Sequence, residues 1–202
     1  MKKIFLLFLL LNGINIFAQE DFYTRVARQI DWNNPNARIN PYMTVADALL
    51  LREWGIYHIP NDNEKRNIMC LADRLGGVLN VYVYGNPPIV ISSWIRPTSV
   101  NAGRIDGNGR LIRDPSSRYN GMNYNASVGG ASRSLHISGL AIDIVDRGNR
   151  PLTNFLLRNQ SLLERQLLWM EDENSATTWV HFDAGERSTS GRPRGRERIF
   201  RP

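Results

Sequence analysis

The segment that most constrains the fold is the run SLHISGLAIDI, from Ser134 to Ile144. In it His136 and Asp143 stand on either side of Gly139, and a glycine lets the backbone turn sharply before residues 140–145 continue as an apolar strand. Apolar neighbours would strip water from the aspartate, which is costly unless a cation or hydrogen bonds compensate. The pattern therefore predicts a turn that leads into a buried strand and carries two possible metal ligands. The more ordinary interpretation is that His136 caps a turn and Asp143 pairs with an arginine.

A second segment, TTWVHFD at residues 177–183, alternates as a strand does. This places Trp179, His181 and Asp183 on one face and Val180 and Phe182 on the other. A lone histidine on a strand is more often structural than metal-bound. Together with the first segment, however, two histidines and an aspartate would give Zn²⁺ three protein ligands and an open fourth position for water, as in catalytic zinc sites.

The remaining pattern indicates an α+β fold. Apolar residues at helical spacing predict helices over residues 44–57 and 62–75, the first capped by Thr44 and ended by Gly55, the second ended by Gly76 and Gly77. Other segments predict strands at 89–95, 140–145, 166–170 and 177–182, a hairpin over 104–113 and a helix over 151–163. We therefore expect a small antiparallel sheet flanked by helices.

Length and cysteine content limit the organisation of the chain. Its 202 residues, 42% of them hydrophobic, provide enough material for one compact core, and we expect a monomer. Cys70 is the only cysteine, so no intramolecular disulfide can form. A single thiol also cannot build a cysteine-rich zinc site, which leaves histidine and carboxylate as the ligand types.

Residues 1–18 read as a secretory signal, with Lys2 and Lys3 before an apolar run and with Ala18 at the expected cleavage site. An uncleaved anchor is the alternative, but the apolar run is short for a bilayer span. We expect a periplasmic or secreted protein without a stable membrane anchor. Cleavage removes both lysines and lowers the formal charge from +6 to +4. The remaining arginine-rich charge fits an acidic polymer such as a cell wall, although solubility alone would also explain it; we expect no nucleic-acid partner.

The sequence predicts four parts, of which the signal at residues 1–18 is the first. Residues 19–41 are expected to form an N-terminal arm, and residues 42–184 the main domain. The tail, residues 185–202, holds six arginines among Gly, Pro and Ser. Two interpretations of the tail stay open: it is disordered, or residues 198–200 add a final edge strand.

Over roughly residues 42–183 the chain resembles the M15 family of zinc peptidases, which includes D-alanyl-D-alanine carboxypeptidases and phage endolysins. The family motif S-x-H-x-x-G-x-A-x-D matches Ser134, His136, Gly139, Ala141 and Asp143, its later W-x-H matches Trp179 and His181, its arginine after a core strand matches Arg96, and its N-x-x-x-G-G run matches Asn125, Gly129 and Gly130. Many matches in the right order make this a far stronger signal than any one of them.

The resemblance implies a hedgehog/D,D-peptidase-like zinc fold in which His136, Asp143 and His181 bind Zn²⁺. It implies hydrolysis of peptidoglycan stem or cross-link peptides, of the D,D-carboxypeptidase or endopeptidase type. Arg96 and Ser134 would contact the substrate, Arg96 by holding a carboxylate in its guanidinium fork. For Arg96 a structural ion pair is the alternative.

The chain departs from the family at the catalytic acid. Three residues before the last histidine, where the family often has a carboxylate, this chain has Thr178. In more distant members the acid lies near the end of the preceding strand, which points to Glu171, with Asp172 and Glu173 as alternatives. A solvated acidic turn would explain all three. Without a competent acid, the protein would be a non-catalytic zinc-containing cell-wall binder; a phage-derived virion or lytic protein is a further alternative.

A second departure is an insertion of about two dozen residues, at 102–124, between the arginine strand and the metal motif. Such a loop is expected to overhang the cleft, where Arg104, Tyr119 and Tyr124 would shape specificity or cover the site. A decorative loop is equally allowed.

Overall fold

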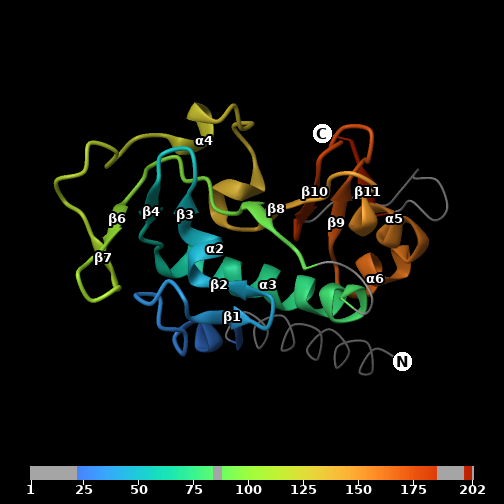
Figure 1. Cartoon of the computed structure of the whole chain (residues 1–202), viewed down its shortest axis with the longest axis horizontal. Helices are drawn as coiled ribbons and strands as arrows, with labels where there is room; N and C mark the ends of the chain where they lie inside the picture. The colour runs from blue at the N-terminus through green and yellow to red at the C-terminus, as the bar shows by residue number, and fades with distance from the viewer. Residues whose placement is uncertain (1–21, 84–87, 186–197, 202) are drawn as a thin grey trace, which may run out of the picture.

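Figure 1 shows a computed structural model of the chain, which describes residues 22–83, 88–185 and 198–201. The expected signal at residues 1–18 and most of the arginine-rich tail lie outside the described residues. Helices are interspersed with the strands of small sheets along the chain, which confirms the α+β class. No helix in the described part of the chain is long and apolar enough to cross a membrane.

The largest sheet has five strands in the order β11-β9-β10-β8-β5. Its strands are β5 (Ile91–Ser93), β8 (Ala141–Val145), β9 (Trp169–Glu171), β10 (Trp179–Asp183) and β11 (Ile199–Phe200). All neighbours are antiparallel except β11, which runs parallel to β9. The strands expected near 89–95, 140–145, 166–170 and 177–182 are therefore present, and the tail adds the edge strand rather than continuing without structure at 198–200.

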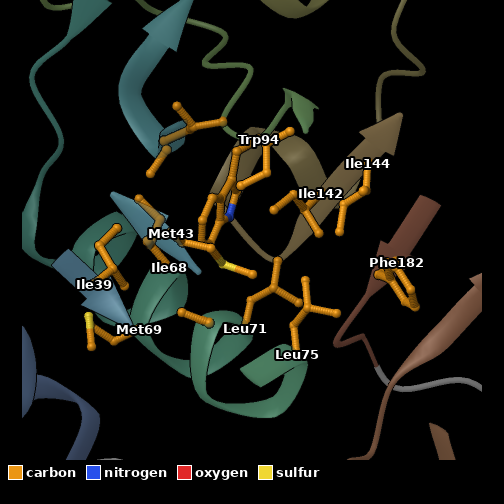
Figure 2. Close-up of a cluster of buried hydrophobic side chains, with 14 of the residues drawn as sticks. Ile39, Met43, Ile68, Met69, Leu71, Leu75, Trp94, Ile142, Ile144 and Phe182 are labelled. Carbon is orange, nitrogen blue, oxygen red and sulfur yellow. The ribbon is translucent and has the colours of Figure 1, made fainter. Parts of the chain in front are cut away.

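The pairing of β8 with β10 separates the two faces of this sheet. Ile144 lies opposite Val180 and Ile142 opposite Phe182, and these four side chains are buried on one face. Figure 2 shows Leu71 and Leu75 of the long helix α3 (Asp62–Tyr82) beneath Ile142 and Ile144 of β8. The other face of the same two strands carries the polar residues of the two motif segments.

Residues 44–57 do not form the single helix that their apolar spacing predicts. Thr44 caps α2 (Val45–Leu49) through a capping box with Asp47, but the helix ends after five residues. The chain then forms β3 (Leu50–Leu51), turns at Gly55 and returns as β4 (Ile56–His58). Pairing with a neighbouring strand overrides the helical pattern here, because β4 also bonds to β6 (Ala102–Ile105).

The expected hairpin over 104–113 is present, with β6 paired to β7 (Leu111–Arg113). These two strands complete a four-stranded sheet in the order β3-β4-β6-β7. A third, two-stranded sheet pairs β1 (Arg38–Asn40) with β2 (Met43–Thr44). In Figure 1 the β6–β7 hairpin lies at one end of the molecule, and β9, β10 and β11 lie toward the other.

Two helix boundaries differ from the prediction. Helix α3 does not stop at Gly76 and Gly77 but continues to Tyr82. A β-carbon at Gly77 would lie 2.5 Å from the Gln166 side chain, so the glycine permits close packing inside the helix rather than ending it. The expected helix over 151–163 is two helices, α5 (Pro151–Arg158) and α6 (Gln160–Arg165), because Asn159 leaves the helical conformation.

Substituting Gly139 tests the turn that precedes β8. Gly139 has φ +80°, and a β-carbon there would lie 3.0 Å from Ile68 Cγ1. Gly139→Ala should lower the free energy of unfolding by roughly 1–2 kcal/mol, the usual cost of a left-handed conformation for an L-residue. Gly107→Ala is the control, because its β-carbon would meet nothing within 4 Å. Equal urea midpoints for the two variants would contradict this account of the turn.

Candidate metal centre

Three side-chain atoms from two separate segments converge on the polar face of the five-stranded sheet. His136 Nε2 lies 3.3 Å from Asp143 Oδ1 and 3.2 Å from His181 Nδ1, and His181 Nδ1 lies 2.8 Å from Asp143 Oδ1. His181 faces Asp143 directly because the two residues are register partners in the β8–β10 pair. In the described residues these three form the one group whose ligand atoms could share a metal ion.

His136 is held by Ser134 and by backbone atoms of the segment that follows β5. It lies in η1 (Leu135–Ser138), a short 3₁₀ turn that Ser134 caps by accepting the His136 backbone N–H at 3.3 Å. His136 Nδ1 lies 2.5 Å from the Trp94 carbonyl oxygen, and the His136 carbonyl accepts the Arg96 backbone N–H at 2.9 Å. The Trp94 indole donates to the carbonyl of Gly139 at 3.0 Å.

The contact with Trp94 determines which nitrogen of His136 faces the site. A carbonyl oxygen can only accept a hydrogen bond, so Nδ1 carries the proton and Nε2 of the neutral ring presents a lone pair. Burial lowers the pKa of His136, against the opposing effect of Asp143, and so favours this neutral form. A backbone partner on the far nitrogen is the usual means by which proteins orient a metal-binding histidine.

Asp143 is a buried carboxylate that contacts the Arg96 guanidinium and one ring nitrogen of each of the two histidines. Its Oδ1 faces the two histidines, while its Oδ2 forms an ion pair with Arg96 Nη2. Burial alone would raise the pKa of Asp143, but the side chains of His136 and His181 beside its Oδ1 outweigh burial and hold the pKa well below its usual range. The carboxylate is therefore ionised at neutral pH, and the arginine pair that the ordinary interpretation expected is present alongside the histidine contacts.

His181 is placed between two aspartates. Its Nδ1 contacts Asp143, and its Nε2 lies 3.8 Å from Oδ2 of Asp183, a fully buried residue. Burial alone would lower the pKa of His181, but Asp143 and Asp183 together raise it to about 9. Sequence reasoning placed Asp183 on the same strand face and gave it no role. The structure shows it as the carboxylate on the far side of this ring.

This donor set fits a zinc ion. Zinc bonds of about 2.0–2.2 Å in a tetrahedral arrangement keep neighbouring ligand atoms about 3.3–3.6 Å apart. Two of the three separations, 3.2 and 3.3 Å, are already close to that range. The third, 2.8 Å, is a hydrogen bond that an ion would replace after His181 loses its proton. Three protein ligands would leave a fourth position open toward solvent.

The triad lies in the wall of a pocket of about 440 Å³. Its lining includes Arg96, Ser134 and Glu171 of the sequence-predicted site residues, together with Trp179 and Asp183. Two exposed arginines, Arg133 and Arg201, also line it. The buried floor is thus acidic and histidine-rich, and cationic groups stand near the surface.

Of the three candidate acids, the structure brings Glu171 alone to this pocket. Asp172 is buried outside the lining, where it accepts hydrogen bonds from Asn174 and pairs with Arg201 Nε at 3.7 Å. Glu173 also lies outside the lining, and its carbonyl accepts a hydrogen bond from Arg150 at 2.7 Å. Position, rather than acidity, therefore distinguishes Glu171.

The predicted overhang of the insertion is wrong for the described pocket, since no residue of 102–124 lines it. Tyr119 and Tyr124 pack instead on Trp54, with ring centroids 4.6 and 4.9 Å away. The insertion continues into α4 (Tyr124–Ser127), where Asn125 donates to the carbonyls of Gly130 and Ala131. These contacts hold the loop that does line the pocket. Arg104 is exposed on β6 and also lies outside the lining.

Comparison of the whole chain with family models, with curated proteins and with solved structures finds no match.

Removing either histidine should remove the metal. After zinc loading and dialysis, we expect about one zinc per chain for the unaltered protein and little for His136→Gln or His181→Gln, measured by atomic emission. His58→Gln is the matched control, because His58 is the third histidine of the chain, is also buried, and pairs with Glu64 away from the triad. Full occupancy in both triad variants would refute the site.

The metal-free protein should lose stability as pH rises from about 6.5 to 9. The folded state raises the pKa of His181 from 6.5 to about 9, so it binds the proton more tightly than the unfolded chain does. The resulting stabilisation is fully present below pH 6.5 and is lost as pH rises through the folded pKa. In the presence of a chelator, the melting temperature of the unaltered protein should fall over this pH range. The melting temperature of His181→Gln should not show this fall. A flat profile for the unaltered protein across this window would contradict the charged His181–Asp143 pair.

Proposed function

We propose that the chain is a zinc-dependent peptidase that hydrolyses peptidoglycan stem or cross-link peptides. The observation that carries the proposal is the convergence of His136 Nε2, Asp143 Oδ1 and His181 Nδ1 beside a pocket that also holds a carboxylate, Glu171. The motif resemblance to the M15 zinc peptidases supports the same reaction and suggests a hedgehog/D,D-peptidase-like fold. The secretory signal expected from the sequence of residues 1–18 would fit a site of action in the periplasm or outside the cell.

Each residue of the site would have a defined task. His136, Asp143 and His181 would hold Zn²⁺, which polarises a scissile carbonyl and makes water acidic enough to attack near neutral pH. Glu171 would accept the proton of the attacking water and pass it to the leaving amine. Asp183 and the Trp94 carbonyl would keep the two imidazole rings in their binding orientations.

Arg96 would serve both the site and the substrate. Its Nη2 pairs with Asp143, and its Nε donates to Ser93 Oγ at 2.8 Å, so the guanidinium orients the ligand carboxylate. Among the described residues Nη1 has no hydrogen-bond partner, and Arg96 lines the pocket. This leaves one edge of the group for a substrate carboxylate. Substrate contact by Ser134 is a further part of the proposal, since Ser134 lines the pocket while its hydroxyl caps η1.

The function is tested by incubating zinc-loaded protein with purified muropeptides and separating the products by chromatography coupled to mass spectrometry. The proposal requires loss of a terminal D-alanine or scission of a cross-link, and inhibition by chelators that is reversed by zinc. Intact muropeptides after incubation with fully zinc-loaded protein would overturn it and favour a non-catalytic cell-wall binder.

Replacing Glu171 tests the assignment of the base. Glu171→Gln should lower kcat by at least about 100-fold, the smaller end of what a positioned general base contributes, while zinc stays bound. Asp172→Asn and Glu173→Gln are the matched controls, because each removes one neighbouring charge outside the pocket lining. Zinc content is measured alongside muropeptide turnover for all three variants. An active Glu171→Gln enzyme, or a larger loss in either control, would show that the base is another group.

A further inference from the structure

The last described strand, β11, forms part of the wall around the metal ligands. Phe200 and Arg201 both line the pocket, although they are more than fifteen residues beyond the final ligand, His181. The Phe200 ring lies edge-on to the imidazole of His181, with centroids 5.9 Å apart and planes at 79°. Aromatic rings in this arrangement attract each other and restrict each other's rotation.

Backbone hydrogen bonds fix β11 beside the strand that ends in Glu171. Met170 N–H donates to the Arg198 carbonyl at 2.9 Å, and Asp172 N–H donates to the Phe200 carbonyl at 2.6 Å. These bonds place Phe200 in register with Glu171. The pair between Asp172 and Arg201 Nε, at 3.7 Å, closes the end of the strand. The position of Phe200 is therefore determined by β9, not by the ring contact alone.

The two side chains of β11 lie on opposite faces of the sheet. Ile199 and Phe200 are equally buried, each 5% exposed. Neighbouring residues of a strand point to opposite sides of a sheet, and Ile199 accordingly packs into the main hydrophobic cluster. Phe200 lies outside that cluster and faces the pocket. A buried aromatic that contributes to the site rather than to the core indicates a positioning role.

We propose that Phe200 is a positioning residue of the metal centre: its ring holds the imidazole of His181 in the orientation that directs Nδ1 toward Asp143 and His136. This proposal rests on the proposed metal site and extends it to a strand that no ligand motif includes. Asp183 contacts His181 Nε2 from the same strand, so Phe200 restrains the ring from outside that strand.

The test uses Co²⁺, whose visible absorption reports the geometry of its ligands, with the full-length chain. Phe200→Ala should weaken Co²⁺ binding on the order of tenfold, the lower end of the effect of partners that orient metal ligands, and should alter the band pattern. Phe200→Tyr keeps the ring and should restore both. Ile199→Ala is the matched control, which should lower the melting temperature and leave cobalt affinity and spectrum unchanged.

Each outcome of this experiment is decisive. Unchanged affinity and spectrum in Phe200→Ala would overturn the proposal, as would an equal change in Ile199→Ala or a failure of Phe200→Tyr to restore them. Absence of Co²⁺ binding by the unaltered protein would refute the metal site and this inference together. Cobalt binding that depends on Phe200 in a protein that cleaves no muropeptide would retain the inference and refute only the peptidase function.

Discussion

The candidate site depends on one constraint, the register between β8 and β10. This register places His181 opposite Asp143 and, on the reverse face, Phe182 opposite Ile142. Because side chains alternate along a strand, a slip of one residue would turn His181 into the core and expose Phe182. The hydrophobic packing against α3 therefore sets the position of the metal-ligand candidates, and the stability of the core and the geometry of the site have the same cause.

The position of the remaining ligand candidate, His136, depends on a different local structure, the turn at η1. Here the Trp94 carbonyl, the Arg96 amide and the left-handed Gly139 hold His136 above β8. The Arg96 side chain then neutralises part of the Asp143 charge. A buried carboxylate is costly unless its charge is paired, and in the metal-free protein Arg96 and the charged His181 supply that pairing.

Local sequence patterns were sufficient for the residues that lie in regular alternation. The strand faces of β8 and β10 follow from a period of two, whereas the meeting of Asp143 with His181 also needs the register of the pair. Patterns failed where distant contacts decide the structure: β3 and β4 replace a helix because β6 pairs with β4, and Gly77 lies inside α3 because Gln166 packs on it. The contribution of Phe200 had no local signal, since it depends on a parallel pairing with a strand about thirty residues earlier.

The most direct measurement of the central claim is a diffraction experiment at the zinc absorption edge on crystals of zinc-loaded protein. The account predicts one strong anomalous peak per chain, about 2.0–2.2 Å from His136 Nε2, Asp143 Oδ1 and His181 Nδ1. A peak bound by other residues, or no peak between these three atoms at full zinc loading, would contradict it.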